Sequence, residues 1–399
     1  MTNIQLLPDY KNPCNPCNLC ENKIMKKILL VFGTRPEAIK MAPLVKEFQK
    51  YPAQFDTKVC VTAQHRQMLD QVLDFFEIKP DYDLDLMRPG QNLHQLTADV
   101  ITKLKPVLEE LNPDFVFVHG DTTTSTASAL AAFYTGAKVC HIEAGLRTYN
   151  KHAPFPEEMN RQITGRLTDI HFSPTEAAKQ NLLSEGVKEN TIFVTGNTVI
   201  DALLYATDKL KSYTDNEIEN LKQIIDFNKK IILVTGHRRE NFGEGFINIC
   251  RSLLHIVENN KEVEIVYPVH LNPNVQDPVN KLLANKSNIK LIQPLSYPAF
   301  VWLMEKSHII LTDSGGIQEE APSLGKPVLV MREVTERPEA VTAGTVKLVG
   351  TDSEKIITET NRLLRDRQYY NNMTKIHNPY GDGKAVGRIV SLISNFVTL

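Results

Sequence analysis

Two series of short apolar runs alternate with helical patterns along this chain, and no other feature constrains the fold as much. Strand-like runs of the first series lie at 28–32, 58–62, 115–118, 138–142, 170–172 and 191–194. Those of the second series lie at 230–234, 263–267, 289–292, 308–311 and 327–330. Continuous apolar runs are typical of parallel strands buried on both faces. The alternation therefore predicts α/β architecture, and the two series predict two doubly wound, Rossmann-like domains.

The length of the chain agrees with two domains, because 399 residues are too many for one hydrophobic core. Residues 1–24 are rich in Asn, Pro and Cys and lack any periodicity, so we predict a disordered N-terminal extension. We expect the folded part to begin at Met25. The predicted divisions are an N-terminal Rossmann-like domain over 25–196, a C-terminal Rossmann-like domain over 197–380 and a final helix within 381–399.

The overall composition is that of an ordinary globular protein, with 42% hydrophobic and 23% charged residues. A formal net charge of −2 gives no support for a nucleic acid or an anionic membrane as partner. No apolar run approaches the ~18 residues that a spanning helix needs. The N-terminus also lacks the apolar core of a signal peptide, so we expect a cytoplasmic protein.

The six cysteines fall into two groups. Cys60, Cys140 and Cys250 lie in apolar segments and are expected to be small core residues. Cys14, Cys17 and Cys20 form a C-x2-C-x2-C pattern. A ferredoxin-like run needs a fourth cysteine, but Ile24 occupies that position. We therefore expect no metal, and a role for this cluster remains open.

A Ser-Gly-Gly turn follows the predicted strand at 308–311 and opens a predicted helix. Asp313 or Ser314 can cap this helix, and the glycines allow a ligand to approach the backbone. A helix N-terminus has unpaired N–H groups and partial positive charge, which favour phosphate. Glu320 lies one turn further on, on the face of Gly316, where a carboxylate could accept hydrogen bonds from ribose hydroxyls. An ordinary capped helix would give the same pattern, so the turn alone leaves both interpretations open.

Carboxylates and arginines follow the strands of the first series. Ligands of doubly wound domains bind beyond the carboxyl ends of the strands. Asp121 follows the strand at 115–118, and Glu143 with Arg147 follows the strand at 138–142. Glu157 and Arg161 come a little later, in a region unsuited to a core. Three carboxylates near one site are what proton-transfer chemistry requires, although Asp121 could also cap the next helix.

Basic residues follow other strands of both series. Arg35 comes after the first strand, where a planar guanidinium could bind phosphate. Gln64 and Arg66 belong to a polar, basic cluster after the second strand. His237, next to two arginines, could be a general acid or a hydrogen-bond donor to phosphate. Arg337 is a further candidate for binding phosphate groups. Each of these residues taken alone could equally be structural.

Several well-known signatures are absent. The chain contains no G-x-x-x-x-G-K-[ST] motif, and its first strand-to-helix turn lacks G-x-G-x-x-G. It also contains no H-E-x-x-H and no G-x-S-x-G motif. Nicotinamide chemistry is therefore not expected, and we predict that the protein uses no cofactor.

Five motifs together resemble one known family. These motifs are Phe32–Pro43 (FGTRPEAIKMAP), His119–Thr123 (HGDTT), His141–Arg147 (HIEAGLR), Gly236–Asn241 (GHRREN) and Asp313–Pro322 (DSGGIQEEAP). They resemble the non-hydrolysing UDP-N-acetylglucosamine 2-epimerases of bacteria over essentially the whole chain from Met25. The resemblance implies a GT-B fold with a central cleft, a homodimer, and interconversion of UDP-GlcNAc and UDP-ManNAc for surface polysaccharide synthesis.

The chemistry implied by this family is elimination and re-addition of UDP. The proton on carbon 2 is not acidic, so inversion needs either transient oxidation or loss of the group at carbon 1. The missing dinucleotide motif argues against oxidation. Loss of UDP gives a 2-acetamidoglucal, and UDP then returns with a proton on the opposite face. Carboxylates move the proton, while cationic groups and a helix N-terminus stabilise the departing diphosphate.

The resemblance also assigns roles to individual residues. The catalytic residues it implies are Asp121, Glu143, Glu157 and His237. The substrate-binding residues it implies are Arg35, Lys40, Phe300 (beside the uracil), Ser314, Gly315, Gly316, Glu320 and Arg337. Arg147 and Arg161, from the loop after the strand at 138–142, complete the predicted binding set. Gln64 and Arg66 match the site of a second, activating UDP-GlcNAc. Which carboxylate acts as the base is left open.

Three other functions share parts of this pattern. A hydrolysing epimerase would release UDP and free ManNAc, because water would capture the intermediate. A GT-B glycosyltransferase would require an acceptor sugar. A catalytically silent UDP-sugar sensor would bind tightly without turnover, but the presence of all three carboxylates argues against it.

Overall fold

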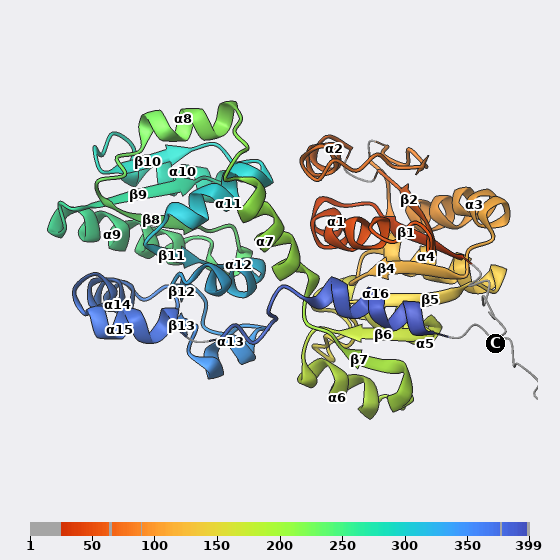
Figure 1. Cartoon of the computed structure of the whole chain (residues 1–399). Helices are drawn as coiled ribbons and strands as arrows, with labels where there is room; N and C mark the ends of the chain where they lie inside the picture. The colour runs from red at the N-terminus through yellow and green to blue at the C-terminus, as the bar shows by residue number, and fades with distance from the viewer. Residues whose placement is uncertain (1–24, 64–65, 89, 376, 397–399) are drawn as a thin grey trace, which may run out of the picture.

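The computed structural model describes residues 25–63, 66–88, 90–375 and 377–396. These residues form two lobes, each built on one parallel sheet with helices on both faces (Figure 1). The predicted extension 1–24, with Cys14, Cys17 and Cys20, lies outside the described residues. The α/β fold class predicted from the sequence is confirmed.

The first lobe contains a seven-stranded sheet with strand order β3-β2-β1-β4-β5-β6-β7. Its strands are β1 (Lys26–Phe32), β2 (Phe55–Val61), β3 (Tyr82–Asp83), β4 (Phe115–His119), β5 (Lys138–Ile142), β6 (Ile170–Ser173) and β7 (Ile192–Val194). Its helices are α1 (Arg35–Gln49), α2 (Arg66–Phe75), α3 (Leu93–Leu111), α4 (Thr123–Thr135), α5 (Glu157–Leu167), α6 (Glu176–Ser184) and the short η1 (Glu189–Thr191).

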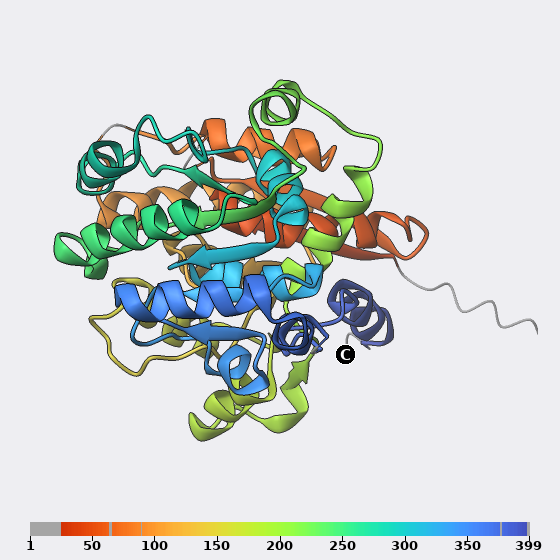
Figure 2. The same cartoon turned by 90° about the vertical axis from the view of Figure 1, so that its left-hand side faces the viewer.

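The second lobe contains a six-stranded sheet with strand order β10-β9-β8-β11-β12-β13. Its strands are β8 (Lys230–Thr235), β9 (Val263–Pro268), β10 (Ile289–Ile292), β11 (Ile309–Thr312), β12 (Val328–Val330) and β13 (Val346–Leu348). Its helices are α8 (Asn216–Ile224), η2 (Arg239–Asn241), α9 (Glu244–Asn259), α10 (Pro273–Leu283), α11 (Tyr297–Lys306), α12 (Gly315–Glu320), η3 (Ala321–Leu324), α13 (Pro338–Ala343), α14 (Ser353–Arg365) and α15 (Arg367–Thr374). Helices α9 and α14 lie side by side on the outer face of this lobe (Figure 2).

Alternating side chains of each central strand enter two different cores. In β1, Leu30 and Phe32 face the core beneath α1 and α2, while Leu29 and Val31 face the core beneath α3 and α4. All four are fully buried. Because both faces are covered, such a strand is apolar at its buried positions, which explains why every predicted strand is observed. The short strands β3 and β13 were not predicted.

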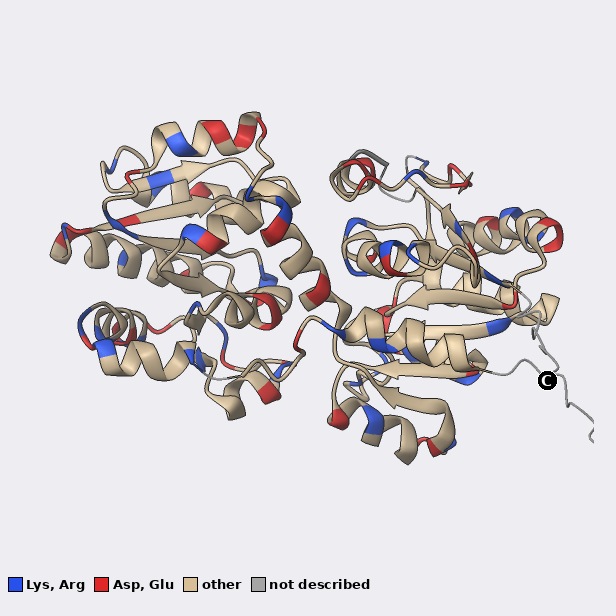
Figure 3. Ribbon diagram, viewed as in Figure 1, with Lys and Arg blue, Asp and Glu red and all other residues tan. Residues whose placement is uncertain are grey.

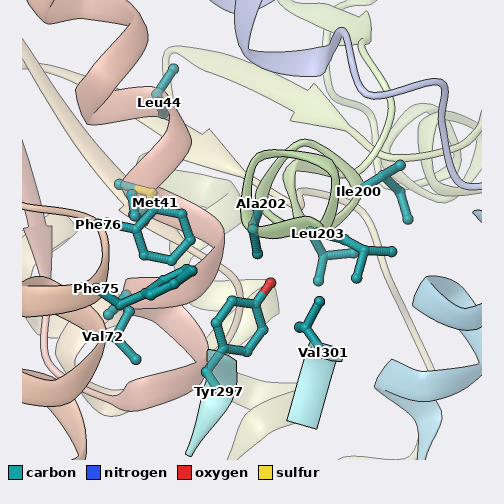
Figure 4. Packing of buried hydrophobic residues seen from close by; sticks show 14 of the residues in the cluster. Met41, Leu44, Val72, Phe75, Phe76, Ile200, Ala202, Leu203, Tyr297 and Val301 are labelled. Atoms are coloured by element: carbon teal, nitrogen blue, oxygen red, sulfur yellow. The ribbon is translucent and has the colours of Figure 1, made fainter. Parts of the chain in front are cut away.

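The two lobes share one apolar core where they meet. The ring of Tyr297 in α11 stacks on Phe76 with centroids 6.1 Å apart and meets Phe75 edge-on at 6.2 Å. Figure 4 shows these rings beside Met41 of α1 and Leu203 of the linking helix α7 (Thr198–Lys209). Side chains from both lobes therefore fill a single cluster.

The chain crosses between the lobes twice, and the two crossings are bonded to each other. Helix α7 follows the first crossing, and the second crossing leads into α16 (Ala385–Asn395), which packs on α1 and α7 of the first lobe. The Asn197 N–H donates to the Tyr380 carbonyl oxygen at 2.7 Å. The buried Asp201 carboxylate accepts from the backbone N–H of Ala385 and of Val386. These bonds fix the C-terminal helix against the start of α7.

No helix in the described part of the chain is both long enough and apolar enough to cross a membrane.

The shared core makes a prediction about stability. Phe76→Ala removes a fully buried ring and is expected to lower the free energy of unfolding by about 3–5 kcal/mol. The matched variant Phe155→Ala removes a ring that is 66% exposed, and its effect should stay within ~0.5 kcal/mol. Urea unfolding followed by the fluorescence of Trp302, the single tryptophan, measures both. Equal midpoints would show that the shared core contributes little.

Candidate active site

The polar residues predicted from the sequence lie on loops at the carboxyl ends of the two sheets. The strand order reverses between β1 and β4 in the first sheet, and between β8 and β11 in the second. Such reversal points are the usual ligand sites of doubly wound sheets. Acidic and basic residues both occur on the segments of each lobe that face the other lobe (Figure 3).

One buried carboxylate ties the β1 loop to the β4 loop. Glu37 accepts hydrogen bonds from the backbone N–H of Gly33 and Thr34, at 3.1 and 2.8 Å. The hydroxyls of Thr122 and Ser125 also donate to it, at 2.6 and 3.0 Å. Sequence reasoning overlooked Glu37, although the capping-box pattern that it forms with Thr34 is visible in the sequence.

Glu143 is the most deeply enclosed of the predicted catalytic residues. Its backbone has a φ of 62°, a left-handed conformation that is uncommon for a residue with a side chain. Its carboxylate forms an ion pair with Lys40, and the His119 Nε2 lies 3.8 Å away. Burial alone would raise the pKa of Glu143, but Lys40, His119 and Arg161 more than offset burial and hold this pKa below its ordinary value.

The other two predicted carboxylates line a cleft of about 630 Å³. Asp121 forms an ion pair with Arg161, and its carbonyl oxygen accepts from the Asn160 side chain at 2.9 Å. Glu157, the first residue of α5, is half-buried in the cleft wall. Arg147 also reaches the wall, but its guanidinium makes two bonds to the Glu185 carboxylate, at 2.7 and 2.9 Å.

On the second lobe, Asp313 holds the β8 loop rather than capping a helix. Its carboxylate accepts from the backbone N–H of His237 and of Arg238, each at 2.8 Å. The His237 Nδ1 lies 3.2 Å from its other oxygen. Ser314 occupies the N-cap position of α12, but its side chain makes no capping bond. The sequence left Asp313 and Ser314 as alternative caps, and neither side chain caps the helix.

Arg337 and Glu320 lie directly over the Ser-Gly-Gly turn. A Cβ atom at Gly315 would be 3.3 Å from the Arg337 Cζ, and one at Gly316 would be 3.4 Å from a Glu320 oxygen. The two glycines thus leave room for these side chains, and Glu320 lies on the face of Gly316, where the sequence placed it. Burial, followed by repulsion from Glu319, raises the pKa of Glu320 to about 8.

Arg35 extends from the first lobe to the second. Its guanidinium donates to the Leu295 carbonyl oxygen at 3.3 Å, and the Glu320 carboxylate is close enough to interact with its charge. Arg35 therefore lies near the predicted ribose carboxylate. Phe300, in α11, is partly buried against the shared core.

The predicted activating site falls outside what the structure describes. Gln64 lies outside the described residues, and only the backbone of Arg66, at the start of α2, is described. Metal binding at the described residues finds no support either, since they contain no cluster of three or more His, Cys, Asp or Glu side chains with suitable geometry.

Three residues that the sequence analysis did not select belong to the same network. These residues are His119, Asn197 and Glu319. The Asn197 amide donates to Glu143 at 3.1 Å and to Glu319 at 2.8 Å. Glu319 in turn accepts from the Arg337 Nε at 2.7 Å. His119 and Glu319 lie within motifs noted in the sequence, HGDTT and DSGGIQEEAP. Asn197 lies outside these motifs and far in sequence from both of its partners, so no local pattern pointed to it.

Comparison with known proteins identifies the family of this chain. A family model described as UDP-N-acetylglucosamine 2-epimerase matches residues 46–394. The UDP-N-acetylglucosamine 2-epimerase of Escherichia coli O157:H7 is 59% identical over 371 residues, covering 92% of this chain and 98% of that protein.

Solved structures show the same likeness. The Neisseria meningitidis UDP-GlcNAc 2-epimerase bound to UDP-GlcNAc has a TM-score of 0.84 and 55% identity, covering 92% of this chain and 99% of that one. The Methanocaldococcus jannaschii enzyme in complex with UDP-GlcNAc and UDP has a TM-score of 0.76 and 34% identity, with the same two coverages. Two parallel sheets with facing carboxyl edges define a protein of the GT-B fold class. The chain belongs to the UDP-N-acetylglucosamine 2-epimerase family.

The loop that carries Glu143 gives a second prediction. Gly145 has a φ of 94°, and a Cβ there would be 2.2 Å from the Ala178 carbonyl oxygen. Gly136 has a φ of 79° and open space around it. Gly136→Ala should therefore lower stability by about 1–2 kcal/mol through backbone strain alone, and Gly145→Ala by a further ~1–3 kcal/mol through the clash. Thermal unfolding of the two variants tests this, and equal losses would contradict the tight contact.

Proposed function

We propose that this protein converts UDP-N-acetylglucosamine to UDP-N-acetylmannosamine, reversibly and without hydrolysis. The observation that carries the proposal is the cleft itself. Asp121 and Glu157 line it from the first lobe, and the buried Glu143 interacts with the charge of Arg161 in the same wall. Arg337 lines it from the second lobe, next to the glycine turn. The first set suits proton transfer, and the second suits a diphosphate leaving group.

The proposed reaction breaks two bonds and then remakes both. A carboxylate takes the proton from carbon 2, the carbon 1–oxygen bond breaks with its electron pair going to UDP, and a carbon 1–carbon 2 double bond forms. In the return step the oxygen of UDP attacks carbon 1, while carbon 2 receives a proton on the opposite face. Proton transfer on both faces of one ring needs more than one acid–base group, in keeping with three carboxylates.

The substrate-binding roles follow the same division. The N–H groups at Ser314, Gly315 and Gly316, with Arg337 and His237, are proposed to hold the diphosphate. Glu320 is proposed to bind the ribose and Phe300 the uracil. Arg35, Lys40, Arg147 and Arg161 are proposed to contact the nucleotide sugar from the first lobe. Gln64 and Arg66 remain a proposed activating site.

The proposal also covers the domain boundaries, the cellular location and the use of the product. We propose that the divisions of the chain at 196–197 and 380–381 are domain boundaries, that the protein acts in the cytoplasm, and that its product supplies surface polysaccharide synthesis. Support for the boundaries comes from the two sheets, which lie on either side of the first crossing.

A homodimer is also proposed, and its surface can be tested. Phe133 and Tyr134 of α4 are 58% and 67% exposed, and Ile163 of the adjacent α5 is 44% exposed. Neighbouring exposed apolar side chains are typical of association surfaces. We expect the wild-type protein to sediment as a dimer and Phe133→Asp to sediment as a monomer. Leu271→Asp, at a position that is 60% exposed in the other lobe, should remain dimeric. A wild-type monomer would exclude the dimer.

Proton NMR in deuterated water with UDP-GlcNAc tests the reaction. We expect UDP-ManNAc with deuterium at carbon 2, formed without any added cofactor. Asp121→Asn and Glu143→Gln should each lower kcat more than about 100-fold, because each removes an acid–base group. Glu354→Gln, at an exposed position of α14, is the matched control and should keep full activity.

The same spectra separate the alternatives. Accumulation of free ManNAc and UDP would indicate a hydrolysing enzyme. Binding of UDP-GlcNAc without turnover would favour a sensor, or a transferase that lacks its acceptor. If Asp121→Asn or Glu143→Gln showed near-normal turnover, the substituted residue would not be an acid–base group of the reaction.

A further inference from the structure

Asn197 is buried at the first crossing between the lobes, where its side chain meets both of them. It is the N-cap of α7, and its Oδ1 accepts from the Val199 N–H at 3.1 Å. Its Nδ2 faces two carboxylate oxygens, one from Glu143 at 3.1 Å and one from Glu319 at 2.8 Å. Because a donor faces the oxygen and two acceptors face the nitrogen, only one orientation of the amide satisfies every partner.

The two carboxylates belong to opposite sides of the cleft. Glu143 follows β5 of the first lobe, whereas Glu319 lies in α12 of the second lobe. Glu319 uses its other oxygen to accept from the Arg337 Nε at 2.7 Å, and both side chains are largely enclosed. A continuous series of hydrogen bonds thus runs from Glu143 through Asn197 and Glu319 to Arg337.

The electrostatics of this series explain why an amide is needed. Two buried carboxylates bonded to the same nitrogen repel each other unless cations and donors lie beside them. Lys40 pairs with Glu143, and Arg337 pairs with Glu319. The amide between them donates to both without adding charge. An aspartate of the same shape would add a third negative charge and remove the donor.

We propose that Asn197 is a positioning residue that sets the orientation of Glu143 according to the position of Glu319 and Arg337. This inference rests on the proposed function, in which Glu143 takes part in proton transfer and Arg337 binds the diphosphate. Binding of the diphosphate at Arg337 would then change the orientation of Glu143 through the Asn197 side chain. Asn197 touches neither the substrate nor the reacting atoms in this scheme and acts only through its two carboxylate partners.

A purely structural role for Asn197 would be to cap α7, and one substitution separates the two roles. Asn197→Ser keeps an oxygen that caps a helix well but removes the amide that joins the carboxylates. We expect kcat to fall about 10- to 100-fold, as for other residues that orient catalytic groups, with KM within about 3-fold of the wild type. Asn197→Asp, also a good cap, should lose at least as much kcat.

Asn92→Ser is the matched control. Asn92 caps α3 through a bond from the Gln95 N–H at 2.9 Å, and it is not one of the residues that line the cleft. This variant should show wild-type kcat and KM. If Asn197→Ser retained the same kcat as Asn92→Ser, the cap would be its whole role and the inference would fall.

The double variant Asn197→Ser/Glu319→Gln tests whether the series acts as a unit. Coupled residues give non-additive effects, so its kcat should fall no further than that of the more impaired single variant. Losses that multiply would mean that Asn197 and Glu319 act separately, which overturns the coupling. A wild-type enzyme without epimerase turnover would overturn the proposed function itself and the inference with it. An active wild type with an unimpaired Asn197→Ser overturns the inference alone.

Discussion

The ion pair between Glu143 and Lys40 is the contact on which the first lobe's side of the cleft depends. Glu143 is almost fully buried, and burying a carboxylate costs folding free energy unless a cation and hydrogen-bond donors lie beside it. Lys40 comes from α1 and Glu143 from the β5 loop, while His119 approaches from the end of β4. The pair therefore joins three separate elements at one edge of the sheet. Removing either partner would leave the other buried and unpaired.

The contacts between the lobes are of two kinds. Tyr297 packs on Phe75 and Phe76 in a continuous apolar core, whereas Arg35 makes a polar contact by donating to the Leu295 carbonyl oxygen. Apolar packing is stable without a ligand and resists water. Polar contacts between partly solvated groups can exchange partners with a ligand at little cost. The apolar core thus holds the lobes together, while polar contacts between them can be exchanged for contacts with a charged ligand.

The sequence predicted most of the fold because the central strands are buried on both faces. From Ile28 to Phe32, β1 has no polar position, so its apolar run is visible without structural information. The strands β3 and β13 were missed because β3 has only two residues and β13 has a lysine at its centre, so neither forms an apolar run. Asp121, Glu143 and the Ser-Gly-Gly turn could be selected because they directly follow strands. Their partners could not, since Asn197 is 54 residues from Glu143 and 122 from Glu319.

Lys40 connects this electrostatic arrangement to the chemistry. Burial favours the neutral form of Glu143, and the Lys40 charge is the largest influence that opposes it. Lys40 is also a proposed contact of the nucleotide sugar. An anionic ligand that draws Lys40 away from Glu143 weakens that opposition while burial remains, so the pKa of Glu143 rises and the carboxylate becomes a better proton acceptor. Without such a ligand the Lys40 charge favours the ionised form of Glu143. The same ion pair would therefore adjust the basicity of Glu143 to the position of Lys40, whichever of the three carboxylates acts as the base.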